Sequence, residues 1–240
     1  MRNIATMARR ELGAFFLSPI AYAVTAIFLF TAGLAFGLGT FAAGHEASLQ
    51  DLLRPWLMLI LVIVLPMLTM RLLSEEMRSG TIETLMTAPI TDAEVVLGKF
   101  LGALVFYVIL LAALLLYPIL LAKYGDVDGK LLVCHYVGLL LLGAFYIAAS
   151  LFFSAWTRHQ VIAVLVSFAV LALMTFAAGG LARLFEGGWP RTLLQQLSVQ
   201  THFEDFVRGL ITVNHLVFFV SMTALFLFLT VKLLETRRWQ

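Results

Sequence analysis

Residues 74–89, which read SEEMRSGTIETLMTAP, separate two long apolar runs at residues 53–73 and 95–122. The segment between these runs is polar, acidic and rich in turn-forming residues. Each apolar run has at least the roughly 20 residues that an α-helix needs to cross about 30 Å of hydrocarbon. The pattern therefore predicts two membrane-spanning helices joined by a compact polar connection.

The same apolar pattern recurs along the whole chain. Hydrophobic residues make up 62% of the sequence and charged residues only 12%, whereas soluble domains carry roughly 25% charged residues. The alternating pattern of a membrane β-barrel is absent. We therefore predict an all-α membrane protein with six transmembrane helices in a single domain, residues 1–240. The six apolar runs lie near residues 20–41, 53–73, 97–122, 131–154, 160–182 and 214–234.

The distribution of basic residues predicts the orientation of these helices. With the N-terminus in the cytoplasm, ten Lys and Arg residues fall inside and six outside, as the positive-inside rule favours. The inside residues are Arg2, Arg9, Arg10, Arg71, Arg78, Lys99, Arg158, Lys232, Arg237 and Arg238. This orientation places both termini and the loop of residues 74–95 in the cytoplasm, and residues 183–213 outside.

Residues 2–17, which precede the first span, have the pattern of a helix that lies in the membrane interface. Apolar residues occupy one face, and Arg9 and Arg10 occupy the other, where they can meet anionic headgroups. Glu11 falls on the apolar face, where it either snorkels to the interface or pairs with a neighbouring arginine, or else contacts a partner subunit. The Ser-Pro pair at 18–19 is predicted to end this helix, because proline disfavours helix in the residue before it.

The cytoplasmic loop after the second span carries its own signals for helix ends. Gly80 allows a sharp turn, and residues 81–87 are predicted to form about two helical turns before Pro89 stops them. Residues 91–94, which read TDAE, fit a capping box that starts the third spanning helix. The loop is therefore predicted to contain a short helix parallel to the membrane, with a solvated connector as the alternative.

Two features inside the spans concern helix packing and shape. Gly33 and Gly37 are spaced as in the G-x-x-x-G pattern, which lets two helices approach closely in lipid. They predict a close helix contact, either within the chain or at a subunit interface. Pro66 predicts a kink in the second span, which serves either as a gating hinge or only as shape.

The long outer loop, residues 183–213, is predicted to contain short amphipathic helices at residues 193–197 and 203–211. Its balance of apolar and polar residues is typical of a segment at the lipid–water boundary. Phe203, Phe206 and Leu210 are predicted to share an apolar face and to form an outer gate that moves during turnover. A static interfacial cap is the alternative.

Motifs for catalysis and for metal or nucleotide binding are missing from the sequence. There is no G-x-x-x-x-G-K-[ST] phosphate-binding loop, no H-E-x-x-H and no G-x-S-x-G. The five histidines are scattered, and the single cysteine, Cys134, has no partner for an internal disulfide. A net charge of +2 without a basic stripe gives no indication of nucleic-acid binding. We expect neither an enzyme nor a resident metal or cofactor.

Several of these segments together resemble the permease subunits of type-2 ABC transporters. The resemblance covers essentially the whole chain and is most specific at residues 76–99, where E-x-x-x-S-G-T-I-E-x-L-x-x-x-P-I precedes V-x-L-G-K. The segments at residues 16–22 and 201–209 and the Arg-Arg-Trp ending are similar to the gliding-machinery (GldF-like) branch. A sibling branch, the permease of nitrous-oxide-reductase maturation, is also similar.

The resemblance implies a permease in a bacterial inner membrane, paired with a second copy or a sibling permease. Two cytoplasmic ATPase subunits would bind ATP and Mg²⁺, and transport would be export. The helix of residues 2–17, with Arg9, Arg10 and Glu11, would be a connector, and residues 80–88 would be the coupling helix. Any large extracytoplasmic domain would have to come from a partner protein. The residues expected to couple to the ATPase are Glu76, Ser79, Gly80, Thr81, Ile82, Glu83, Leu85, Met86 and Pro89.

A second function class stays open beside the ABC permease, namely a stand-alone carrier, channel or membrane scaffold. The spans carry no charged residue in their middle, whereas ion-coupled carriers keep such groups near the bilayer centre. Energy is therefore expected to enter from outside the membrane domain, through the 74–95 loop. The sequence leaves the substrate undetermined.

Overall fold

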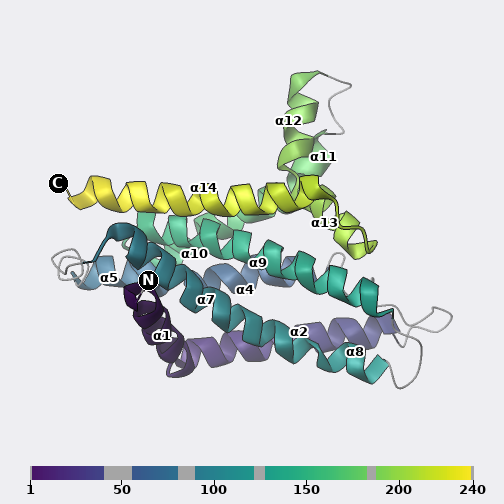
Figure 1. Cartoon of the computed structure of the whole chain (residues 1–240), viewed down its shortest axis with the longest axis horizontal. Helices are drawn as coiled ribbons and strands as arrows, with labels where there is room; N and C mark the ends of the chain where they lie inside the picture. Colours follow the sequence, from purple (N-terminus) through teal and green to yellow (C-terminus); the bar gives the residue numbers. More distant parts are fainter. Residues whose placement is uncertain (1, 41–55, 81–89, 122–127, 183–187, 239–240) are drawn as a thin grey trace.

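The computed structural model describes residues 2–40, 56–80, 90–121, 128–182 and 188–238, and every element in these ranges is a helix (Figure 1). The elements are α1 (Arg2–Phe16), α2 (Pro19–Thr40), α4 (Trp56–Thr69), α5 (Arg71–Ser79), α7 (Asp92–Leu114), α8 (Leu116–Leu121), α9 (Gly129–Trp156), α10 (Gln160–Ala172), the π-helical turn η1 (Leu173–Ala177), α11 (Ala178–Ala182), α12 (Trp189–Leu197), α13 (Val199–Val207) and α14 (Val213–Arg238).

Six helices in the described residues are long and apolar enough to cross a membrane, which confirms the predicted number. They cover Pro19–Gly37, Trp56–Ser79, Asp92–Leu120, Gly129–Trp156, Gln160–Ala182 and Val213–Arg237. The second is longer than predicted, because residues 74–79 continue the helix instead of starting a loop. No helix-breaking residue intervenes before Gly80, which ends α5 with a φ of 74°.

The second span is interrupted at Met70, between α4 and α5. Met70 lies four residues after Pro66, and its N–H still donates to the Pro66 carbonyl. The hydroxyl of Ser154, on α9, accepts from the N–H groups of Leu73 and Ser74 and donates to the carbonyl of Met70. A buried side chain thus satisfies backbone groups at the interruption, so α9 fixes the direction in which α5 leaves α4.

The centre of the bundle is α9, which contacts α4, α5, α7, α10, α13 and α14. Close packing on α9 depends on glycine. A Cβ built at Gly143 would overlap the fully buried ring of Tyr107 on α7, and one at Gly138 would lie 2.7 Å from Cβ of Phe206 on α13. The core therefore assembles around small residues on one central helix, as is common where helices approach closely in lipid.

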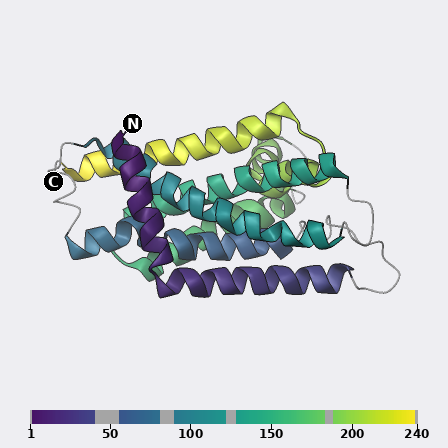
Figure 2. The same ribbon diagram turned by 60° about the horizontal axis from the view of Figure 1, so that its bottom comes forward.

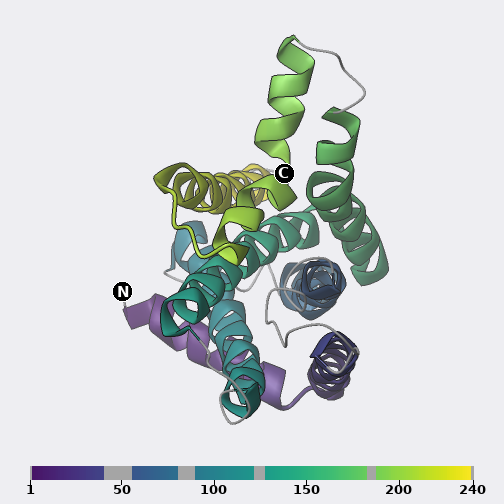
Figure 3. The same cartoon turned by 90° about the vertical axis from the view of Figure 1, so that its right-hand side faces the viewer.

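The remaining helices are arranged around the ends of this bundle. The helix α1 lies across the spanning helices instead of along them, and the two chain ends lie toward the same end as α5 (Figures 1 and 2). At the other end, α12 projects sideways from the bundle (Figure 3). All nine residues of α12 are at least partly exposed.

The outer segment differs from its prediction. Its helices are α12 and α13, and α13 ends at Val207 instead of continuing to residue 211. Gly209 ends it with a φ of 80°, while the N–H of Leu210 donates to the Asp205 carbonyl and that of Gly209 to the Phe206 carbonyl. This glycine-centred end motif turns the chain away. Consequently Phe206 is buried, as is Phe203, and Leu210 is 56% exposed. The predicted shared face of these three residues is wrong.

The predicted glycine contact is found at only one of its two positions. A Cβ built at Gly33 would lie 2.9 Å from the hydroxyl of Tyr117 on α8, whereas one at Gly37 meets nothing within 4 Å among the described residues. A close contact at Gly37 stays a prediction.

Candidate functional site

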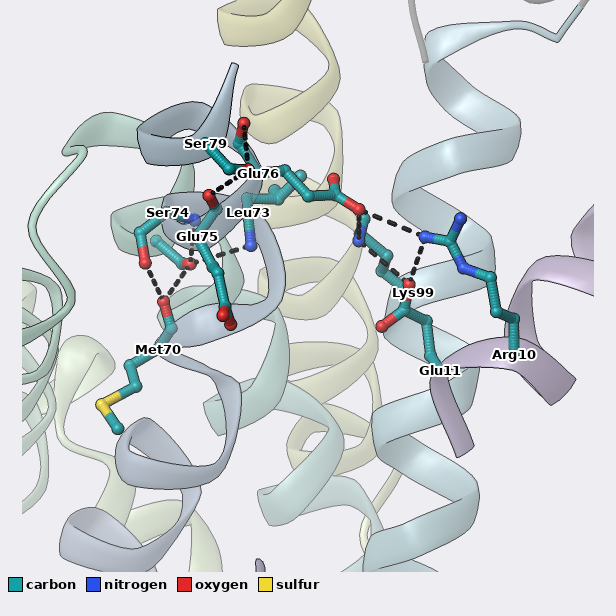
Figure 4. A network of polar contacts seen from close by, with 10 residues as sticks. Arg10, Glu11, Met70, Leu73, Ser74, Glu75, Glu76, Ser79 and Lys99 are labelled. Carbon is teal, nitrogen blue, oxygen red and sulfur yellow. Dashed lines mark hydrogen bonds and ion pairs between the residues drawn. The ribbon is translucent and has the colours of Figure 1, made fainter. Parts of the chain in front are cut away.

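Four charged side chains from α1, α5 and α7 meet near the crossing of α1 over α7 (Figure 4). The Nζ of Lys99 on α7 lies 3.1 Å from Oε1 of Glu11 on α1 and 2.7 Å from Oε1 of Glu76 on α5. Arg10 contacts the same two oxygens through its Nη2 atom, at 2.9 and 3.2 Å. We call these four residues, Arg10, Glu11, Glu76 and Lys99, the charge quartet. Two carboxylates balance two cations, so it is neutral when all four are ionised.

Burial makes the charge quartet a stronger constraint than a surface salt bridge. The side chain of Lys99 is 1% exposed and that of Glu11 is 10% exposed, while Arg10 reaches solvent at 57%. Burial raises the pKa of Glu11, but the charge of Lys99 and the hydrogen bonds from Arg10 and Lys99 outweigh it, so this pKa lies below its ordinary value. The hydrogen bond to Glu11 raises the pKa of Arg10. The folded protein thus favours the ionised forms of both residues.

The helices α1 and α7 approach closely enough to bring Glu11 and Lys99 together. A Cβ built at Gly98 would lie 2.6 Å from Cβ of Met7, and one at Gly102 would lie 2.8 Å from Cβ of Glu11 and 3.1 Å from the Ala8 carbonyl oxygen. The sequence Gly98-Lys-Phe-Leu-Gly102 is itself a G-x-x-x-G pattern. It makes a close helix crossing of the kind predicted for Gly33 and Gly37, at a pair of glycines that the sequence analysis did not single out.

Two further arginines fix the neighbouring helix ends. Arg71, the first residue of α5, donates to the carbonyl of Ala14 and the hydroxyl of Ser18, and its guanidinium lies 5.3 Å from the centre of the Phe15 ring. It therefore holds the turn between α1 and α2. At the end of α14, Arg237 donates to the Trp156 carbonyl, at 2.7 Å, and contacts the sulfur of Met77, at 3.0 Å. This contact joins the ends of α14 and α9 to α5.

The charge quartet joins the two helices that flank the predicted coupling segment. Glu76 is three residues before the end of α5, and Lys99 is on the second turn of α7. The capping box at the start of α7 is confirmed: Thr91 accepts from the N–H of Glu94, whose carboxylate accepts from the N–H of Thr91. Residues 81–89 therefore connect α5 and α7, two helices that the charge quartet joins.

The predicted coupling and connector residues lie in four places. Glu76, Arg10 and Glu11 meet in the charge quartet, while Ser79 and Gly80 end α5 and Arg9 is exposed on α1. The remaining coupling residues, Thr81, Ile82, Glu83, Leu85, Met86 and Pro89, lie outside the described residues.

Sequence reasoning missed Lys99 as a partner of Glu11. It counted Lys99 only as a cytoplasmic charge, although the Gly98–Gly102 spacing around it was available as a signal of close packing. For Glu11, pairing with the neighbouring Arg10 was one of the predicted alternatives, and the structure supports it. Within the described residues, no group of His, Cys, Asp or Glu side chains is arranged to hold a metal ion.

The six apolar helices and their buried core define a multi-pass membrane protein. A family model described as ABC-2 family transporter protein matches residues 57–238, and the chain belongs to this family. Membership implies partnership with an ABC ATPase and with the lipid bilayer. A search of curated proteins found no match to the chain.

Proposed function

We propose that this protein is the permease subunit of an ATP-driven exporter and couples ATP hydrolysis in a separate subunit to substrate movement. The single observation that carries the proposal is the charge quartet, which joins α1 to α5 and α7, the two helices that flank residues 81–89. A push on that segment would reach three helices together, because the ion pairs and the α1–α7 crossing connect them. This is the mechanical requirement for receiving work from a soluble ATPase.

The remaining parts of the proposal follow from this role. Residues 80–88 form the coupling helix, α1 is an interfacial connector, and α12 and α13 bound the exit in the outer leaflet. The whole chain acts as one transmembrane domain in a bacterial inner membrane, with both termini cytoplasmic. It pairs with a second copy or a sibling permease of the gliding-machinery-like branch, and an extracytoplasmic protein is a further partner. The position of both chain ends near α5 supports the shared side of the termini (Figure 2).

Replacing Leu85 with aspartate is expected to release the ATPase or uncouple transport. On a helix over residues 81–87, Ile82, Leu85 and Met86 share one face, and a buried apolar anchor typically carries more binding energy than charges at the rim. Thr84→Asp places the same charge on the opposite face and is the matched control. Co-purification of the ATPase with each variant, at equal membrane insertion, measures the effect. Equal recovery with both variants would contradict the anchoring role of Leu85. Recovery of no ATPase even with the unaltered chain would favour a stand-alone carrier, channel or scaffold.

The purified chain without its ATPase is expected to hydrolyse no ATP, because it has no phosphate-binding loop. Nucleotide and Mg²⁺ would bind to the partner subunit. Phosphate release is compared with that of a mock preparation from cells without the gene. Turnover that rises in proportion to the amount of this chain would contradict the proposal.

A further inference from the structure

A chain of three hydrogen bonds links α12, α13 and the start of α14. The Nε2 atom of His202 lies 3.0 Å from the Gln196 carbonyl oxygen. Its Nδ1 atom lies 2.6 Å from Nδ1 of His215, and Nε2 of His215 lies 2.7 Å from Oδ2 of Asp205. The ring of His202 also stacks on that of Phe218, with ring centres 4.0 Å apart.

The hydrogen-bond acceptors in this series of contacts determine how many protons the two histidines and Asp205 hold. A carbonyl oxygen can only accept, so Nε2 of His202 carries a proton. The contact between the two Nδ1 atoms needs one proton, because two bare nitrogens or two N–H groups cannot form a hydrogen bond. The contact between His215 and Asp205 needs a third. With three protons shared by two imidazoles and a carboxyl group, the group of three side chains is electrically neutral.

We propose that Asp205, His215 and His202 form a proton-binding site in which His215 is a protonated imidazolium between a carboxylate and a neutral imidazole. The contact between Nε2 of His215 and Oδ2 of Asp205, at 2.7 Å, carries one proton, which we assign to the ring nitrogen. His215 then donates at both nitrogens, and Nδ1 of His202 accepts. The ligand of this site is a single proton, and it joins α13 to α14.

The surroundings favour the neutral form of His202. Burial lowers its pKa, and the hydrogen bond to Gln196 raises it only in part. His215 lowers and Asp205 raises the same pKa through their charges. Glu204 on α13 and Arg208, the residue after its end, form a charged pair with exposed side chains, which contact each other at 3.6 Å. On α9, which packs against α13, His135 contacts the Val207 carbonyl through Nε2, and Lys130 is exposed.

A change in the number of protons on the two Nδ1 atoms breaks the bond between the rings. A second proton, at low pH, places two N–H groups against each other and two positive rings side by side. Loss of the shared proton, at high pH, leaves two bare nitrogens facing. For a histidine whose pKa is lowered on folding, the stabilising contribution is present above the ordinary value of 6.5 and decreases as the pH falls toward the folded value. The link between α13 and α14 is therefore expected to weaken on acidification.

The shared proton can be detected by ¹⁵N NMR. The unaltered protein is labelled with ¹⁵N-histidine and measured in lipid bilayers. At pH 7 we expect a scalar coupling between two ring nitrogens of different histidines. We also expect that three of the four ring nitrogens of His202 and His215 carry a proton. The coupling should disappear at pH 5. Two protonated nitrogens in the pair, or no coupling between rings at any pH from 5 to 9, would overturn the proposal.

A pH series of melting temperatures tests the consequence for stability. Between pH 7 and pH 5 the unaltered protein is expected to lose about 2–4 °C more than His202→Gln, as for titration of one group in a chain of this size. The control His159→Gln, at the start of α10, should behave as the unaltered protein does. If His202→Gln loses as much as the unaltered protein, the site does not control stability. If that variant does not fold, the NMR experiment still decides the proton count.

Discussion

The double variant Glu11→Gln with Glu76→Gln is expected to lose about 3–5 kcal/mol of the free energy of unfolding. Both carboxylates contact the Nζ atom of Lys99, whose side chain is 1% exposed. Without them the buried ammonium has no acidic partner among the described residues, and an unpaired buried charge is strongly unfavourable. Unfolding in detergent, followed by heat or by denaturant, measures the loss.

A third change separates the effect of the unpaired charge from that of altered packing. Adding Lys99→Met to the double variant removes the buried charge and is expected to restore most of the lost stability, because an apolar side chain of similar volume needs no partner. Glu75→Gln is the matched control, since Glu75 is exposed on the same helix. A double variant that unfolds like the unaltered protein, or one that Lys99→Met does not rescue, would contradict the assigned role of the charge quartet.

Gly102→Leu is expected to force α1 away from α7. Its Cβ alone would lie 2.8 Å from Cβ of Glu11 and 3.1 Å from the Ala8 carbonyl oxygen, so one helix backbone has to move. Overpacking of this kind costs about 1–3 kcal/mol, occasionally more. Displacement of Glu11 adds the loss of its contact with Lys99. The melting temperature and the rate of proteolysis within residues 2–16 measure the two parts of the effect.

Gly37→Leu is the matched control for this variant, because it adds the same side chain to a spanning helix where nothing lies within 4 Å among the described residues. It is expected to leave the melting temperature of the isolated chain nearly unchanged. Equal destabilisation by both variants would contradict the close crossing at Gly102. A change of oligomer size in Gly37→Leu would indicate that a second permease packs on this face of α2.

Local sequence patterns predicted the ends of several elements correctly. The Ser-Pro pair at 18–19 separates α1 from α2, Gly80 ends α5 in the left-handed region, and the capping box at 91–94 begins α7. In each case the deciding interaction joins residues within a few positions of each other. The same approach failed at Leu210, because helical spacing was extended across Gly209, whose end motif had not been recognised.

The candidate site could be predicted only in part. Glu11 was identified as unusual because it falls on the apolar face of α1, but the sequence offered a neighbouring arginine or another subunit as its partner. Lys99, which lies 88 positions away, is also its partner, and this ion pair matters for stability because the Lys99 side chain is buried. Likewise, the sequence separated His202 from His215 as scattered residues, although they lie in direct contact.

The sequence by itself determined that this is a six-span, all-helical membrane protein, because a run of about 20 apolar residues has few alternatives to a spanning helix. It also determined where a polar segment interrupts the spans. Only the tertiary structure decided which charges and glycines meet, since one helix sequence can pack against a neighbour through any of its faces. The crossing of α1 over Gly98 and Gly102 selected Glu11 and Lys99 as partners, and their burial makes that pairing an energetic requirement.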